Sequence, residues 1–284
     1  MALKTKKRTS YIIRRILFYS FIILLSLVCI IPFYWMVRSS FMKSTQIYVI
    51  DPFVFWPQEM IWENYKDATK FMPFLDYTRN TLLLVVLNIV GTVLTSAMCA
   101  YSFSRIKWKG RNLVFMIILS SIMLPGSVTI ISQFIMWSNL KLIDTYWPLT
   151  LPAFFGGGVT NIFMLRQFFM TIPKEMDESA TIDGAGHIRI FLQIIVPLSK
   201  SALIVVGLFT FLGCWNDVFG PVMYLNSPQK FTLSLGLLQF RGEYTTKWNL
   251  LMAASTLVIA PCVIVYLIGQ KYLIEGITLT GLKA

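Results

Sequence analysis

The sequence is poor in charged residues. They make up only 13% of its 284 residues, whereas hydrophobic residues make up 56%. Soluble globular proteins carry about 25% charged residues. The shortage of charge therefore excludes a soluble globular protein, and the mean hydropathy of +0.67 indicates a chain that lies in lipid.

Cysteine and histidine are too few, and wrongly spaced, for a metal site or a disulfide framework. The four cysteines lie inside apolar runs, so we interpret them as small apolar residues. The single histidine, His187, is expected on an exposed surface. The sequence also lacks the G-x-x-x-x-G-K-S/T loop that binds nucleotide phosphates. We predict no catalytic residue, no metal and no cofactor in this chain.

Long apolar runs are the main feature that is present. A helix needs about 20 apolar residues to cross a membrane, where every backbone polar group must be satisfied within the helix. Six stretches meet this length: Ile16–Val37, Thr81–Phe103, Leu113–Ile135, Trp147–Phe169, Ala202–Leu225 and Leu250–Ile268. We predict an all-α integral membrane protein, a helical bundle with six transmembrane helices surrounded by membrane lipid.

The first apolar run has a basic flank, as a signal peptide does. Its apolar core is longer than the roughly 7–15 residues of a signal peptide, and no A-x-A cleavage site follows it. We therefore interpret this run as an uncleaved transmembrane helix.

The formal net charge of +12 raises the question of a nucleic-acid partner. The basic residues gather before the first apolar run and between the second and third: Lys4, Lys6, Lys7, Arg8, Arg14, Arg15, Arg105, Lys107, Lys109 and Arg111. Cytoplasmic loops of membrane proteins are enriched in Lys and Arg. Six crossings place both basic loops on one side, so the charge needs no nucleic acid. We predict a multi-pass protein with both termini in the cytoplasm.

These patterns divide the chain into five parts. We expect a cytoplasmic N-terminal segment, a first transmembrane helix, an extracytoplasmic segment, a domain with five transmembrane helices and a cytoplasmic tail, at residues 1–15, 16–37, 38–76, 77–270 and 271–284. The loops are too short to build a second core.

Residues 173–197, which we call the hairpin segment, are the most informative part of the chain. Pro173 suits a first helical position, and acidic residues follow where they meet the positive end of the helix dipole. The run Asp183-Gly184-Ala185-Gly186 tolerates a left-handed turn. An apolar face at helical spacing comes next, made of Ile188, Phe191, Ile194 and Ile195. The pattern predicts a helix, a turn and a second helix.

The hairpin segment is also acidic, on the side of the membrane where basic residues are favoured. Between Pro173 and Gly186 it has one Lys and four acidic residues. One interpretation is a short helix that docks into a groove of a basic cytoplasmic partner. The other is an ordinary loop hairpin, in which Glu178 caps its own helix.

The hairpin segment resembles the EAA loop of bacterial ATP-binding cassette (ABC) importer permeases. The pattern of that loop is E-A-A-x3-G-x9-I-x-L-P. This chain matches it at Glu178, Ala180, Gly184, Ile194 and Pro197. It departs from the pattern at two positions, with Ser179 in place of Ala and Val196 in place of Leu. Both exchanges are compatible with the predicted order of a helix, a turn and a second helix.

The flanking sequences look like the maltose-type carbohydrate permeases along nearly the whole chain. The similar stretches are Ile172–Glu175, Ile182–Ala185, Phe209–Asp217, Leu250–Ser255 and Gly276–Ala284. The resemblance implies the type I ABC importer permease fold in a bacterial inner membrane, with residues 77–270 as an ABC transmembrane type-1 domain.

The resemblance further implies partners and a function. The partners are a second permease subunit that completes a heterodimer, a cytoplasmic ATPase dimer that binds ATP and Mg, and an extracytoplasmic sugar-binding protein. The implied function is ATP-driven import of a sugar or oligosaccharide by alternating access. The residues implied to couple the chain to the ATPase are Glu178, Ala180, Asp183, Gly184 and Ala185. Gly184 is the most firmly placed, because a side chain would oppose the turn.

Two other functions stay open at this point. An ABC importer permease could carry another solute, such as a phosphodiester or an oligopeptide. A stand-alone ion-coupled transporter would need internal repeats and an ion site near the membrane midplane. The sequence shows no obvious repeat, which favours the ABC permease.

A compact polar group lies inside the fifth apolar run. Trp215, Asn216 and Asp217 offer an aromatic face, an amide and a carboxylate, which are the groups that bind sugars. Ionisable residues in membrane helices usually face a protein interior or a water-filled cavity. One interpretation is contact with the substrate, and the other is hydrogen bonding that holds the helices together.

Glycine and proline lie in or near several of the predicted helices. They are Pro125, Pro152, Pro221, Pro261 and the run Gly156-Gly157-Gly158. These residues allow kinks, local unwinding and close approach of helices. Gating of a pathway and simple packing both use such kinks.

Overall fold

The computed structural model describes residues 2–47, 55–57, 59–242 and 246–281. Those residues form helices joined by loops, and their extended pairing is limited to one isolated bridge between Arg241 and Thr246. The predicted all-α class is confirmed. Contacts divide the chain into two units: unit 1 is Met1–Met72 with Phe240–Leu257, and unit 2 is Pro73–Gln239 with Val258–Ala284.

The described residues contain four helical segments that are long and apolar enough to cross a membrane. They are Tyr11–Ser40 in α1 (Ala2–Ser40), α4 (Phe74–Ser104), Trp147–Thr171, and Trp248–Leu273 in α15 (Trp248–Gly281). Two bent pairs of helices pass the same test, Arg111–Met123 with Gly126–Asn139 and His187–Leu198 with Lys200–Trp215. If each bent pair is one span, the chain has six, as the sequence predicts.

Unit 1 holds α1, α2 (Ser44–Ile47), α3 (Glu63–Phe71) and the start of α15. The buried amide of Asn64 donates to the carbonyl oxygens of Ser40 at 2.8 Å and Met42 at 3.0 Å. Its oxygen accepts from the amide of Asn249 at 2.9 Å. This side chain therefore fixes the chain just after α1. The expected extracytoplasmic segment at 38–76 lies partly outside the described residues.

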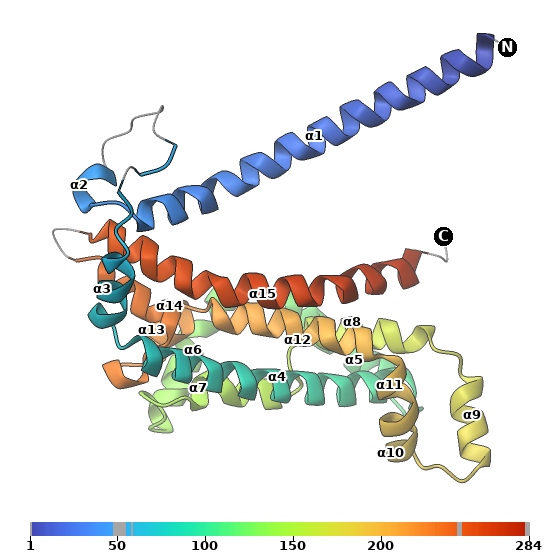
Figure 1. Cartoon of the computed structure of the whole chain (residues 1–284). Helices are drawn as coiled ribbons and strands as arrows, with labels where there is room; N and C mark the ends of the chain where they lie inside the picture. Colours follow the sequence, from blue (N-terminus) through green and yellow to red (C-terminus); the bar gives the residue numbers. More distant parts are fainter. Residues whose placement is uncertain (1, 48–54, 58, 243–245, 282–284) are drawn as a thin grey trace. The chain divides into compact units, whose positions relative to one another are not determined.

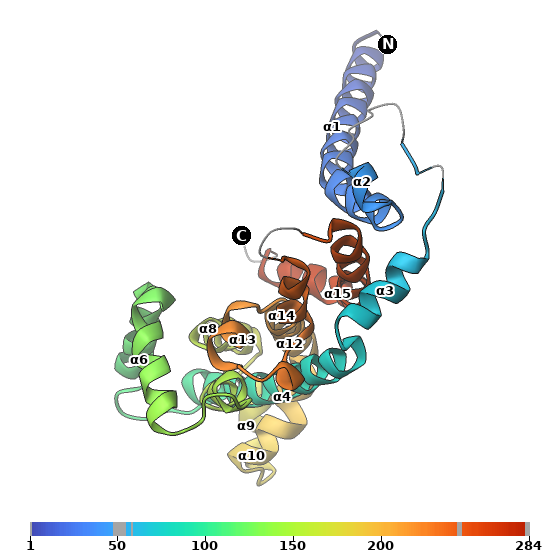
Figure 2. The same cartoon turned by 90° about the vertical axis from the view of Figure 1, so that its left-hand side faces the viewer.

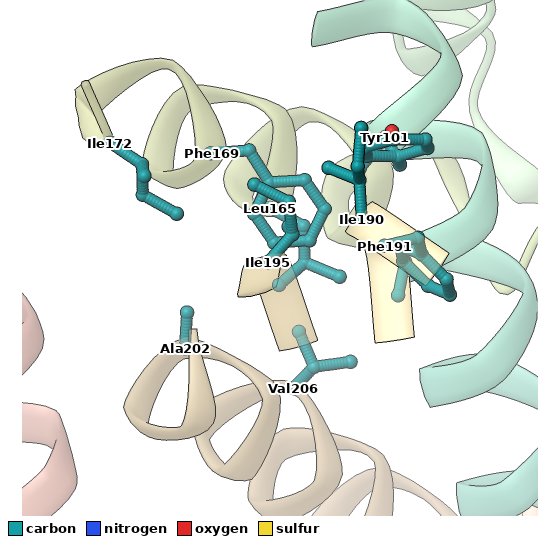
Figure 3. Packing of buried hydrophobic residues seen from close by; sticks show 11 residues of the cluster. Tyr101, Leu165, Phe169, Ile172, Ile190, Phe191, Ile195, Ala202 and Val206 are labelled. Carbon is teal, nitrogen blue, oxygen red and sulfur yellow. The ribbon is translucent and has the colours of Figure 1, made fainter. Parts of the chain in front are cut away.

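Unit 2 is built around α4, which packs against both α8 (Val159–Thr171) and α12 (Lys200–Trp215). Figures 1 and 2 show α12 running alongside α4. A buried group, which we call the inner cluster, joins these helices to residues 190–195. It consists of Ala97, Ala100, Tyr101, Leu165, Phe169, Ile172, Ile190, Phe191, Ile195, Ala202 and Val206 (Figure 3). The two alanines on α4 let the helices approach closely.

The predicted span Leu113–Ile135 is broken at a proline. α5 (Arg111–Ser120) continues into the short turn η1 (Ser121–Met123), and α6 (Gly126–Asn139) follows at an angle of 98°. Leu124 and Pro125 between them are extended, with ψ of 116° and 136°. Proline disfavours the helical conformation in the residue before it and donates no N–H, which favours a break here. Pro261, by contrast, lies inside the continuous helix α15.

The predicted span Trp147–Phe169 is unwound in its middle. α7 (Trp147–Thr150) and the turn η2 (Leu151–Phe154) precede Gly156, Gly157 and Gly158, whose φ values are +91°, +63° and +91°, and α8 follows. The interruption frees backbone carbonyls, which membrane helices must satisfy by other means.

Polar residues of α4 satisfy two of the carbonyls before this break. The amide of Asn88 donates to the carbonyl oxygen of Leu149, and the hydroxyl of Thr95 donates to that of Ala153, both at 3.0 Å. On the other side of the break, the amide of Asn161 donates to the carbonyl oxygen of Gly157 at 2.7 Å. The glycine run therefore produces local unwinding, one of the outcomes expected from the sequence.

The predicted span Ala202–Leu225 also divides. α12 ends at Trp215, and α13 (Phe219–Tyr224) begins after three residues that are not helical. The carboxylate of Asp217 accepts from the N–H of Gly220 at 3.0 Å, as a capping residue does. The apolar segment that joins α12 as a bent span instead comes before it, at His187–Leu198, with a bend of 78°.

A hairpin of short helices connects α8 to α12. α9 (Glu175–Ile182) leads through a turn to α10 (His187–Ile190), the π-helical turn η3 (Phe191–Ile195) and α11 (Val196–Leu198). Figure 1 shows this hairpin leaving the long helices of unit 2 at one end. The chain after α13 passes through the short elements η4 (Pro228–Lys230), α14 (Leu233–Leu237) and η5 (Leu238–Phe240).

Candidate functional site

The turn of the hairpin segment is formed by its own backbone. Gly184 takes a φ of +81°. The N–H of Ala185 donates to the carbonyl oxygen of Ala180 at 2.9 Å, and the N–H of Gly184 donates to that of Thr181 at 3.0 Å. These two bonds around a left-handed glycine form a Schellman motif, which ends α9. The predicted helix, turn and helix are confirmed.

The five residues implied to couple the chain to an ATPase lie on and behind this turn. Glu178, Asp183 and Gly184 are exposed, whereas Ala180 and Ala185 are half-buried against the inner cluster. A Cβ atom on Gly184 would meet no atom within 4 Å. The backbone conformation, not packing, therefore requires glycine. The coupling role of the five residues stays a prediction.

The apolar face of the second helix differs from the predicted one. Ile195 and Phe191 are buried and Ile194 is half-buried, but Ile188 is 77% exposed, and Ile190 takes its place in the inner cluster (Figure 3). Ile190, Phe191, Ile194 and Ile195 keep regular helical spacing, so the spacing fits a face with either Ile188 or Ile190. The packing selects Ile190, and the assignment of Ile188 to this face is wrong.

Arg105 is a residue of the site that the sequence interpretation missed, because it was counted only as a cytoplasmic charge. It follows α4, and its side chain is 3% exposed. Its guanidinium donates to the carbonyl oxygens of Phe169 and Ile172 and pairs with the carboxylate of Asp177 in α9 at 3.3 Å. No local pattern connects residues so far apart in the sequence.

Asp144 forms a second polar cluster, near the N-terminal end of α4. Its carboxylate accepts from the N–H groups of Asn226 and Ser227, both at 2.9 Å, and from the ammonium of Lys230 at 2.9 Å. These hydrogen bonds, that of the Ser227 hydroxyl foremost, lower the pKa of Asp144 well below its ordinary value. Asn80 of α4 donates to the carbonyl oxygen of Gln229 in the same loop at 2.8 Å. The cluster holds two loops together.

Residues 78–278 match the family described as "Binding-protein-dependent transport system inner membrane component". The match covers more than half of the chain and includes most of α4, the hairpin segment and nearly all of α15. The chain belongs to this family. It is therefore a multi-pass membrane permease, and its function is transport rather than catalysis.

Two relatives of this permease are similar over most of their length. The trehalose/maltose transport system permease protein of Thermococcus litoralis is 31% identical over 96% of this chain and 98% of that protein. The sn-glycerol-3-phosphate transport system permease protein of Yersinia enterocolitica is 31% identical over 88% of this chain and 91% of that protein. Both are named as permease proteins of transport systems.

A solved structure shows the same fold. It is the crystal structure of a bacterial ABC transporter involved in the import of the acidic polysaccharide alginate. The TM-score is 0.79 and the identity 22%, over 91% of this chain and 96% of the other. The likeness supports the type I importer fold expected for this permease.

The three polar residues near the end of α12 point to different partners in the permease. Trp215 is buried, and its indole N–H donates to the carbonyl oxygen of Val258 in α15 at 3.0 Å. The amide of Asn216 donates back to Leu212 at 2.8 Å, and Asp217 caps α13. Each side chain thus has a contact within the chain. Substrate contact by these residues remains a prediction.

Trp215→Phe separates the two interpretations of this group. We expect the variant to lose about 1.5 kcal/mol of stability, because it loses one buried hydrogen bond and part of a packed ring. Thermal unfolding in detergent measures the loss, and Trp147→Phe, which changes an exposed ring, is the control. An unchanged unfolding temperature with a raised KM for uptake would instead favour substrate contact.

The part of the chain that the structure describes contains no group of three or more His, Cys, Asp or Glu that could hold a metal ion. Cys29, Cys99, Cys214 and Cys262 are free thiols.

The guanidinium of Arg166 in α8 donates a hydrogen bond to the carbonyl oxygen of Phe103 in α4 at 3.2 Å.

Proposed function

We propose that this permease imports a sugar or oligosaccharide as one half of a heterodimeric pathway. A second permease subunit supplies the other half, an extracytoplasmic binding protein delivers the sugar, and an ATPase dimer binds ATP and Mg. The named substrates of the trehalose/maltose relative and of the alginate transporter are saccharides. A related alginate transporter structure contains a periplasmic protein with a bound alginate pentasaccharide. These likenesses support a saccharide substrate.

The single observation that carries the coupling mechanism is the geometry of the hairpin segment. It leaves the long helices of unit 2 at one end (Figure 1), and it presents exposed carboxylates next to a hydrogen-bonded turn. A basic groove on the ATPase would be complementary to these charges. When the ATPase dimer closes, it moves the hairpin segment, and the helices change between outward-facing and inward-facing states.

The orientation of the permease in the membrane is inferred from the end of unit 2 that carries the hairpin segment. The basic loop between α4 and α5 lies next to the hairpin segment, to which Arg105 connects it. Basic loops favour the cytoplasmic side. We therefore place this end of unit 2 in the cytoplasm, where the ATPase dimer is. The basic residues of the N-terminal segment favour the same side of the membrane for both termini.

A second candidate substrate is a phosphorylated polyol, favoured by the relative that is named for sn-glycerol-3-phosphate transport. Uptake of labelled disaccharides and of labelled sn-glycerol-3-phosphate into proteoliposomes distinguishes the two. The complex used must contain its own binding protein, because that protein presents the substrate to the permease.

Gly184→Val tests the coupling mechanism. A β-branched residue at a φ of +81° costs about 1–2 kcal/mol, so the turn should change conformation. We expect substrate-stimulated ATP hydrolysis by the assembled complex to fall about tenfold, as a coupling loss of about 1.4 kcal/mol requires. Glu178→Gln should weaken the same response by removing an exposed charge.

Gly110→Val is the matched control for strain. Gly110 has a φ of +85° and equally open surroundings, but it lies outside the hairpin segment. The Gly110→Val substitution strains a different turn, and it leaves the residues of the proposed contact with the ATPase unchanged. Normal assembly and full substrate-stimulated hydrolysis in both Gly184→Val and Glu178→Gln would contradict the coupling role.

A further inference from the structure

Arg105 occupies an unusual position at the base of the hairpin segment. Its side chain is almost fully buried, although Arg is rarely buried unless paired. One nitrogen of its guanidinium, Nη2, donates to the carbonyl oxygens of Phe169 and Ile172, the latter at 2.7 Å. These carbonyls belong to the C-terminal end of α8, where the carbonyl oxygen of Phe169 also accepts from the N–H of Ile172 at 3.2 Å. The cation therefore completes the end of α8.

The other terminal nitrogen of the same guanidinium reaches the hairpin segment. Nη1 of Arg105 lies 3.3 Å from Oδ2 of Asp177, near the start of α9, and the carboxylate side chain is only 20% exposed. The residue that follows α4 thus contacts, through one planar group, the end of α8 and the beginning of α9. We call the contacts of Arg105 with Phe169, Ile172 and Asp177 the arginine clamp.

Arginine has the geometry that such a junction requires. The guanidinium carries five N–H donors in a rigid plane, so one side chain can bind two carbonyls and a carboxylate at once. Because the two carbonyls fix the plane, a displacement of α9 acts on the end of α8 and on the residue that follows α4. Both helices would then move with α9.

The arginine clamp also has unused hydrogen-bonding capacity. Nε of Arg105 and Oδ1 of Asp177 are buried, and neither has a hydrogen-bond partner among the described residues. Unpaired buried polar atoms are uncommon and costly in folded proteins. A spare donor and a spare acceptor allow the pair to exchange one contact for another while α9 changes its angle.

We propose that Arg105 and Asp177 are positioning residues that transmit movement of α9 to α4 and α8. The proposal rests on the proposed coupling function, since the ATPase must act on α9 for there to be a movement. α4 packs against both α8 and α12, so a displacement at its end reaches the helices on either side. The arginine clamp lies behind the exposed turn and connects it mechanically to the transmembrane helices.

The test uses the assembled complex with its binding protein and sugar, in proteoliposomes. It compares Arg105→Gln and Asp177→Asn with Lys107→Gln, a control that removes a positive charge from an exposed residue of the same loop. The first measurement is hydrogen exchange in the peptide that covers residues 175–182. We expect exchange to be about tenfold faster in both clamp variants, because α9 is released, and unchanged in the control.

The second measurement is the number of sugar molecules transported for each ATP hydrolysed. We expect this ratio to fall at least about threefold in the clamp variants, while the ATPase subunits still co-purify in parental amounts. Arg105→Lys should give an intermediate ratio, because an ammonium group cannot hold both carbonyls and the carboxylate in one plane. If the complex with Arg105→Gln does not assemble, the two measurements are made on Asp177→Asn alone. That variant keeps the hydrogen bonds from Arg105 to the carbonyl oxygens at the end of α8.

Two results would overturn the proposal. Parental exchange rates in both variants would show that the arginine clamp does not hold α9. Faster exchange with a parental transport ratio would show that it stabilises the hairpin segment without transmitting movement. Neither result resembles a failure of the coupling function itself, which is measured independently in Gly184→Val and Glu178→Gln.

Discussion

Gly157→Ala is expected to destabilise the folded permease severely. A Cβ atom at this position would lie 2.5 Å from the carbonyl oxygen of Thr92 and 2.8 Å from its Cα, both backbone atoms of α4. Neither atom can move without displacing the helix at the centre of unit 2. The φ of +63° adds strain for any residue with a side chain. We expect a loss of about 4 kcal/mol in total.

The two neighbouring glycines are matched controls for this prediction. Gly156 and Gly158 have φ values of +91°, but a Cβ atom would lie 3.5 Å from Ile162 at the first position and 3.7 Å from Asn161 at the second, which are ordinary contacts. Gly156→Ala and Gly158→Ala should lose only the stability that corresponds to a side chain at a positive φ, about 1–2 kcal/mol. The yield of monodisperse protein after detergent extraction measures the outcome. Equal yields for Gly157→Ala and Gly156→Ala would contradict the close approach to α4.

Asp144→Ala is expected to have the second largest effect, a loss of about 3 kcal/mol. The carboxylate accepts several hydrogen bonds from Asn226, Ser227 and Lys230, and bonds to charged groups are the stronger kind. The loss is smaller than a sum over these bonds, because the Lys230 side chain is 40% exposed and its ion pair is screened by water. Thermal unfolding of the purified permease measures it.

The pH dependence gives this prediction a second test. Folding lowers the pKa of Asp144, so its stabilisation is present at neutral pH and is lost as the pH falls below the ordinary carboxyl range of about 4. The difference in unfolding temperature between the parent and Asp144→Asn should therefore shrink as the pH is lowered from 7 to 3. A difference that stays constant over this range would mean that the charge of Asp144 does not stabilise the two loops.

The sequence determined the features of this permease that depend on neighbouring residues. Apolar runs of sufficient length identified the candidate membrane-spanning segments, because a helix in hydrocarbon needs no partner to satisfy its own backbone. The turn at Gly184 was also predictable, since a Schellman motif uses bonds within six consecutive residues. The motif that resembles the EAA loop identified the family, which the match over residues 78–278 confirmed.

Only the tertiary structure decided how the spans are interrupted and connected. Hydropathy cannot show that Asn88 and Thr95 of α4 satisfy carbonyls of the unwound segment, or that Asp217 begins a new helix. Helical spacing fits either Ile188 or Ile190 on the buried face, and only the packing shows that Ile190 is buried and Ile188 is exposed. The contact of Arg105 with Asp177 joins residues 72 positions apart. Such contacts depend on how helices pack, and packing is not encoded in any short stretch of sequence.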